Sequence, residues 1–217
     1  VGAHAAAALR HGELAPRRSA GDIGPLLAIT PGDDGTSRDL TAWFGPLADA
    51  GLSSVVLREP EVTAERLARL CEVAGASGLE VWVHDRNPAA RSRTEGLHLT
   101  AKGAAPRGRR FGRSCHTPAE LDDTFAEGAT YALLSPVFPP TSKGHDARTP
   151  LGIERAAAWA AGRSVWGLGG ITPPRVGAVR DAGLRGVAVL GAIFGQRSPA
   201  DGAKMVTTLL AAWSDGA

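Results

Sequence analysis

The chain has 217 residues, of which 43% are apolar, and a formal net charge of +2. This length can bury one sizeable core, so we expect a single domain, with two domains as the alternative. The small charge excess gives no reason to expect nucleic acid or a membrane surface as a partner, and no apolar run approaches the roughly 20 residues that span a bilayer. A small anion is the better expectation.

The first 24 residues contain an alanine run and then basic, glycine and proline residues, without a convincing signal-peptide cleavage pattern. We interpret residues 1–24 as a flexible N-terminal extension and residues 25–217 as the folded domain. A short helix over residues 3–10 and a transit peptide are alternatives. Cys71 and Cys115 are the only cysteines, which is too few for a disulfide framework and fits a reducing cytosol, so we expect a cytoplasmic protein.

Short β-branched or leucine-rich runs then alternate with longer segments of helical spacing, which is the pattern of βα units and a parallel sheet. The eight expected strands are 26–30, 54–58, 80–84, 96–99, 110–114, 130–135, 164–168 and 186–190. The expected helices are 38–50, 63–77, 118–127, 152–161, 173–182 and 199–213. The helices after the third and fourth strands are expected to be short or missing.

Three of the expected helices end at a glycine that can take the left-handed capping conformation, namely Gly51, Gly128 and Gly183. Eight such units predict one closed (β/α)8 TIM barrel rather than an open doubly wound sheet, and no G-x-G-x-x-G motif follows the first strand. In a barrel the chemistry lies on the loops that follow the strands.

The clearest site signal is a pair of glycine loops after strands seven and eight. Gly169 and Gly170 precede a helix that opens with Pro173, and strand eight ends at Leu190 and Gly191. Glycine lets a ligand approach the backbone closely, and a helix start supplies unpaired N–H donors, which together favour phosphate. Tight βα turns would also explain the glycines, but these two loops are the common phosphate site of the fold, so we expect a phosphate cup here.

Strand five ends at Cys115 and His116, of which at most one faces the barrel mouth because side chains alternate along a strand. Thr117 can cap the next helix. His116 at the mouth suits acid/base chemistry, and a histidine that only hydrogen-bonds within its loop is an equal alternative. The loop over residues 135–145 resembles an active-site lid, in which Lys143 could contact an anionic substrate.

Charged side chains also follow strands two and three, at Arg58 and at His84-Asp85-Arg86. A lone carboxylate is a poor Mg²⁺ site, so we expect Asp85 to form a structural pair with an arginine. His98 alternates with leucines in strand four and is expected to be structural.

These motifs resemble the thiamine phosphate synthase and TenI superfamily over nearly the whole chain from Leu26, which implies a (β/α)8 barrel. The similar segments are 57–59, 84–86, 96–99, 112–116, 135–138 with Lys143, 169–172 and 186–189. In this superfamily the synthase joins an aminopyrimidine diphosphate to a thiazole phosphate using Mg²⁺. The TenI-type enzymes are thiazole tautomerases, which aromatise a carboxythiazole phosphate tautomer through a proton shift.

The chain departs from the synthase pattern in the half that handles diphosphate and metal. The motif similar to Q-x-R-E-K has Val56 and Pro60 in place of its Gln and Lys. The motif similar to H-L-G-Q-x-D continues after His98-Leu99 as Thr100-Ala101-Lys102-Gly103, so its metal-binding carboxylate is absent. His84 replaces the usual Asn before Asp85, and Gly191 stands where many relatives have Ser.

The resemblance therefore favours a TenI-like thiazole tautomerase in thiamine biosynthesis, with His116 as the general acid/base and a small phosphorylated thiazole-like substrate. No metal or organic cofactor is implied, and Asp85 would bind metal only in a synthase. A divergent thiamine phosphate synthase and a non-catalytic phosphate-ligand binder or regulator are the alternatives. The oligomeric state stays open, a homo-oligomer included. The expected substrate-binding residues are Arg58, His84, Ser114, Lys143, Gly169, Gly170, Leu190 and Gly191.

Overall fold

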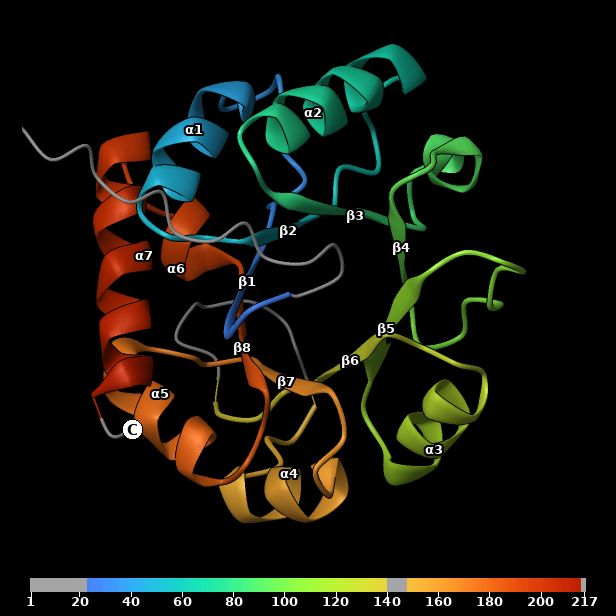
Figure 1. The fold of residues 1–217 in the computed structure, drawn as a ribbon, viewed down its shortest axis with the longest axis vertical. Coiled ribbons are helices and arrows are strands. Elements are labelled where there is room, and N and C mark those ends of the chain that lie inside the picture. The colour runs from blue at the N-terminus through green and yellow to red at the C-terminus, as the bar shows by residue number, and fades with distance from the viewer. Residues whose placement is uncertain (1–22, 140–147, 216–217) are drawn as a thin grey trace, which may run out of the picture.

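The structure is a computed structural model that describes residues 23–139 and 148–215. Its eight strands are all parallel, each pairs with the next, and the eighth pairs with the first, which closes a barrel with the helices outside (Figure 1). The predicted single (β/α)8 TIM barrel is confirmed. The strands are β1 (Leu26–Ile29), β2 (Ser54–Leu57), β3 (Glu80–His84), β4 (Gly96–Leu99), β5 (Phe111–Cys115), β6 (Tyr131–Leu134), β7 (Val165–Leu168) and β8 (Gly186–Val189).

The helices follow the expected order, with the long C-terminal α7 packing against α1, α5 and α6 and so joining the last unit to the first. As predicted, only a short 3₁₀ helix follows β3, and residues 100–110 after β4 contain no helix. No helix among the described residues is long and apolar enough to cross a membrane. The helices are α1 (Thr41–Asp49), α2 (Ala64–Ala76), η1 (Pro88–Ser92), α3 (Pro118–Ala126), α4 (Ile153–Ala160), α5 (Pro173–Asp181), α6 (Gly191–Phe194) and α7 (Pro199–Ser214).

Local capping sets several of these boundaries. Gly51, Gly128 and Gly183 have φ of +100°, +84° and +78°, so the predicted glycine ends of α1, α3 and α5 are confirmed. At the start of α3, the Thr117 hydroxyl accepts a hydrogen bond from the Glu120 amide at 3.2 Å, with Pro118 in the first turn. The sequence contains no comparable signal for α6, whose four residues are too few to show a helical period.

Two apolar layers hold the barrel together. The larger layer lies between the strands and the helices, and the smaller one fills the barrel interior around Trp82, Tyr131 and Trp166. Of the residues that we assign to the N-terminal extension, Ile23 and Gly24 are described. The Ile23 side chain is buried in the inner layer, and the Gly24 carbonyl accepts a hydrogen bond from the Trp166 indole at 2.9 Å.

The three large rings of the inner layer fit because glycines face them from neighbouring strands. A Cβ atom on Gly112 would lie 2.1 Å from the Tyr131 ring. The same construction on Gly96 and on Gly186 gives 2.3 Å to Trp82 and to Trp166 respectively. These distances are too short for any Cβ contact, so the inner layer requires glycine at all three positions.

We predict that Gly112→Ala destabilises the protein by about 1–3 kcal/mol, because the added methyl overpacks a filled interior. The matched control is Gly75→Ala within α2, where a Cβ meets nothing within 4 Å. Removing a helical glycine there should stabilise by about 0.5–1 kcal/mol. Urea unfolding of both variants measures the two changes, and equal midpoints would contradict the assignment of Gly112 to a packed interior.

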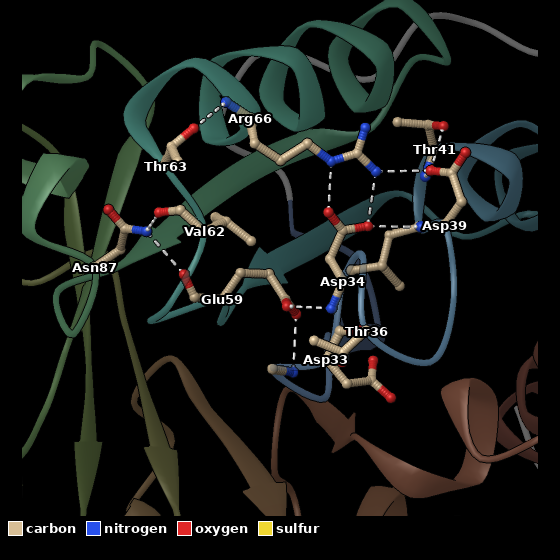
Figure 2. A network of polar contacts seen from close by, with 12 residues as sticks. Asp33, Asp34, Thr36, Asp39, Thr41, Glu59, Val62, Thr63, Arg66 and Asn87 are labelled. Atoms are coloured by element: carbon tan, nitrogen blue, oxygen red, sulfur yellow. Dashed lines mark hydrogen bonds and ion pairs between the residues drawn. The ribbon is translucent and has the colours of Figure 1, made fainter.

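A polar network ties together the loops that follow β1, β2 and β3 (Figure 2). The buried Glu59 carboxylate accepts hydrogen bonds from the Gly32 and Asp34 amides, both at 2.9 Å. The Asp34 carboxylate accepts two from Arg66 of α2, at 2.6 and 2.9 Å. The Asn87 amide group donates to the Glu59 carbonyl at 2.8 Å. The network therefore fixes the mouth of the barrel where Arg58 lies.

We predict that Glu59→Gln lowers the free energy of unfolding by about 1–3 kcal/mol, because the amide group of Gln would face one of the two backbone N–H donors. Glu72→Gln is the control, since Glu72 pairs with Arg69 on an exposed helix face and should change stability by less than about 0.5 kcal/mol. Chemical denaturation of both variants tests this, and a Glu59→Gln protein as stable as the control would show that the network contributes little.

Candidate functional site

The carboxyl ends of β6, β7 and β8 surround a hollow of about 760 Å³. The two glycine loops lie on its wall, and α5 and α6 both begin there, where the first N–H groups of a helix have no partner within it. We call this hollow the phosphate cup. Its principal lining residues are Ser135, Arg148, Leu168, Gly169, Gly170, Thr172, Leu190 and Gly191.

The glycines of the cup are required for different reasons. Gly169 and Gly170 have φ of +98° and +63°, and a Cβ on Gly170 would lie 2.3 Å from the Pro139 carbonyl oxygen. Both glycines therefore allow the loops after β6 and β7 to pack closely against each other. A Cβ on Gly191 would meet nothing within 4 Å, so the cup has open space at this position.

A second pocket, of about 510 Å³, adjoins the cup at the mouth of the barrel. We call it the basic pocket, because four cationic side chains line it and no carboxylate does so among the described residues. Burial, and then the neighbouring Arg86, lower the pKa of Arg58. Ser135, Arg148, Leu168 and Leu190 line both the cup and the basic pocket. The four cations of the basic pocket are Arg58, Arg86, Lys102 and Arg148.

His116 lies in the basic pocket, whereas the Cys115 thiol is buried within 3.3 Å of the Thr124 hydroxyl of α3, as strand alternation predicts. The His116 Nδ1 atom is 2.8 Å from the Ser135 carbonyl oxygen and 2.7 Å from an Arg148 guanidinium nitrogen. The same guanidinium nitrogen is 2.5 Å from Nε2. The imidazole is thus held between two residues that line both pockets, Ser135 and Arg148.

Asp85 is held by groups other than the arginine that we expected. Its carboxylate lies 3.2 Å from His84 Nδ1 and accepts hydrogen bonds from the Thr100 amide at 3.2 Å, because β3 and β4 are neighbours in the barrel. Among the described residues no ion pair joins Asp85 to an arginine, so the predicted pairing is not found there, although the predicted structural role is supported. Burial raises the pKa of Asp85, but the hydrogen bonds from His84 and Thr100 outweigh it and leave the pKa below its usual value.

The Mg²⁺ ion that a synthase would use does not fit these residues. The Asp85 side chain is only 8% exposed, and its oxygens are already hydrogen-bonded. Mg²⁺ usually needs one or two carboxylates together with substrate oxygens, and Glu59 is committed to backbone amides. Within the part of the chain that the structure describes, no three His, Cys, Asp or Glu side chains gather closely enough to hold a metal ion.

Beneath the basic pocket, His98 connects the mouth to the barrel interior. Its Nδ1 atom is 2.8 Å from the Tyr131 hydroxyl and its Nε2 atom 3.0 Å from the Ser114 hydroxyl. Complete burial lowers the pKa of His98 to about 3, so this imidazole is neutral. The structural role expected for His98 is supported. Ser114 lines the pocket as predicted, but its hydroxyl is engaged by His98.

The structure brings most of the predicted site residues together. Arg58, His84, Ser114 and His116 line the basic pocket, the four residues of the glycine loops line the cup, and Lys143 lies outside the described residues. Arg148 was missed, because it follows the strand-six loop without any motif. Arg86 belongs to the His84-Asp85-Arg86 motif and Lys102 to the loop after β4, but their common direction becomes apparent only when the strands close into a barrel.

Comparisons with known proteins identify the family and several relatives of the chain. The family described as thiamine monophosphate synthase matches residues 26–193. A thiamine-phosphate synthase of Chromobacterium violaceum is 34% identical over 159 residues, covering 69% of this chain and 73% of that protein. One of Haloquadratum walsbyi is 31% identical over 188 residues, covering 79% and 84%. One of Synechococcus is 32% identical over 203 residues, but the match spans only 56% of that protein.

Among solved structures, thiamine phosphate pyrophosphorylase from Pyrococcus furiosus superimposes with a TM-score of 0.72. The two chains are 18% identical, and the superposition covers 91% of this chain and 98% of the other, so the likeness concerns the fold. The match to the family extends from β1 to α6 and includes both glycine loops and every strand. The chain therefore belongs to the thiamine monophosphate synthase family.

Proposed function

We propose that the chain is a transferase of thiamine biosynthesis that joins an aminopyrimidine diphosphate to a thiazole phosphate. The observation that carries the proposal is the junction of two compartments, the phosphate cup and the basic pocket, which share Ser135, Arg148, Leu168 and Leu190. A reaction between two phosphorylated molecules needs two such compartments side by side, whereas a tautomerase acts on one molecule. The synthase names of the relatives support the same choice over the tautomerase that the sequence motifs favour.

In the proposed reaction the phosphate cup holds the thiazole phosphate, and the basic pocket holds the diphosphate of the pyrimidine. The carbon–oxygen bond to the diphosphate breaks, and the diphosphate leaves with the bonding pair. The thiazole nitrogen supplies the pair for the new carbon–nitrogen bond. The cations of the pocket stabilise the charge that develops on the leaving oxygen, and the apolar Leu168 and Leu190 lie where the two rings would meet.

The test is to incubate the purified chain with both substrates and to measure thiamine phosphate by mass spectrometry, with Mg²⁺ and with a chelator in parallel. We expect product that depends on both substrates. Absence of product under both conditions would contradict the transferase. Thermal stabilisation by a thiazole phosphate without any turnover would instead favour the non-catalytic binder.

A thiazole tautomerase of the TenI type is the second candidate, favoured by the His116 imidazole, which lines the basic pocket and contacts Ser135 and Arg148 where the two pockets meet. In that case the chain aromatises the thiazole tautomer without a pyrimidine substrate. The His116→Ala variant should then lower the rate by a factor of about 10² or more, because a positioned general acid/base is lost. A full rate in that variant would remove His116 from the chemistry.

The open space at Gly191 gives a prediction about the cup itself. The Gly191→Ser variant should bind inorganic phosphate about 2–10 times more tightly, because a hydroxyl gains one hydrogen bond without a clash. The Gly170→Ser variant is the control, which should lose stability because its φ is +63° and its Cβ would meet the Pro139 carbonyl. Titration calorimetry measures the first change and thermal unfolding the second. Unchanged phosphate affinity in Gly191→Ser would place the phosphate elsewhere.

The remaining expectations are part of the same proposal. Cys71 and Cys115 are both buried free thiols, which supports a reducing, cytoplasmic setting. A homo-oligomer and the absence of nucleic-acid or membrane partners stay predictions.

A further inference from the structure

The side chains that line the basic pocket carry an excess of positive charge. Arg58, Arg86, Lys102 and Arg148 line it, and none of its described lining residues is acidic. Arg58 is half-buried, and its guanidinium donates to the Pro31 carbonyl at 3.0 Å, which holds it at the pocket wall. Such a site concentrates positive charge and favours a strongly anionic ligand.

The neighbouring carboxylates offset this charge only in part: Glu59 raises the pKa of Arg58, but burial and the charge of Arg86 outweigh that effect. Asp85 is hydrogen-bonded to the Thr100 amide and hydroxyl, and Glu59 accepts from two backbone amides. Gly103 occupies the acidic position of the similar family motif, and a Cβ there would lie 2.5 Å from Asp85 Oδ2. A second carboxylate could therefore not stand beside Asp85 without displacing it, which leaves a divalent cation without its ligands.

The loop after β4 carries Lys102 instead, directly before Gly103. An ammonium group is a compact positive charge with three donors, and a guanidinium can bind phosphate oxygens through two parallel hydrogen bonds. Together these groups can neutralise a diphosphate in the way that a divalent cation would. Burial and then the positive charge of Arg86 lower the pKa of Arg58, and an anion between the two guanidinium groups would relieve their repulsion.

We propose that the diphosphate subsite of this chain works without a divalent metal, with Arg58, Arg86 and Lys102 neutralising the diphosphate directly. The inference rests on the proposed transferase function and adds to it the means by which the leaving group is stabilised. The bond that breaks is still the carbon–oxygen bond to the diphosphate, and the electron pair still leaves on oxygen. The side chains supply the compensating charge, so no further reactant is needed.

Binding of inorganic pyrophosphate to the full chain tests the subsite without any turnover. Titration calorimetry should detect binding in EDTA, and excess Mg²⁺ should weaken it, because Mg²⁺ competes with the side chains for the phosphate oxygens. Binding that requires Mg²⁺ would overturn the proposal.

The Lys102→Gln variant should weaken pyrophosphate binding in EDTA on the order of tenfold or more, since a charge-assisted hydrogen bond is lost. Its affinity for inorganic phosphate should stay unchanged, because the phosphate cup does not include Lys102. Lys204→Gln is the matched control on the exposed face of α7 and should bind pyrophosphate like the wild type. Arg86, like Lys102, is an exposed residue of the basic pocket, and the Arg86→Gln variant should also bind pyrophosphate more weakly in EDTA. Wild-type pyrophosphate affinity in both the Lys102→Gln and the Arg86→Gln variants would overturn the proposal.

The coupling assay separates this inference from the function on which it rests. Thiamine phosphate formed in EDTA supports both. Product formed only with Mg²⁺ would retain the transferase and overturn the metal-free subsite. No product under either condition would contradict the transferase, while the pyrophosphate titrations would still decide whether the subsite binds diphosphate without metal.

Discussion

The packing of three aromatic rings against three glycines inside the barrel is the constraint on which the rest of the structure depends. Trp82, Tyr131 and Trp166 fill the interior only because Gly96, Gly112 and Gly186 leave room for them. Parallel strands must pack on both faces, and here the inner face is closed by these rings. A ligand is therefore excluded from the lower barrel and must bind at the carboxyl ends of the strands.

Above the rings, at the mouth of the barrel, the carboxylates and the cations have different roles. The carboxylates of Asp34, Asp85 and Glu59 are turned toward backbone amides or neighbouring side chains and hold the loops in place. The cations are left to line the basic pocket. This division of roles explains how a chain of nearly neutral net charge presents a strongly positive site.

Much of this arrangement was predictable from the sequence. Alternation along β5 sends His116 into the mouth and Cys115 toward α3, and the glycines after α1, α3 and α5 mark their ends, because these effects depend only on adjacent residues. The pairing of Asp85 with Thr100 and the convergence of Arg148 with His116 could not be predicted. They depend on which strands become neighbours and on where a loop returns, which no local pattern specifies.

For the same reason, the sequence motifs alone are not enough to choose between the transferase and the tautomerase. Comparing motifs reveals the carboxylate that is missing from the loop after β4, and that loss favoured the tautomerase. It does not reveal that Arg86 and Lys102 face the same pocket as Arg58, since their common direction arises from the closure of the barrel. Substituted positions in a family site are therefore better judged by the total charge around the ligand than one by one.

The histidine within the barrel has a consequence for the range of conditions in which the fold persists. His98 has a pKa of about 3 when buried, against about 6.5 when the chain is unfolded. Below pH 6.5 the unfolded chain takes up a proton that the folded chain refuses, so acidification progressively favours unfolding until the pH approaches 3. The burial of His98 between Ser114 and Tyr131 thus makes the barrel interior itself sensitive to acid.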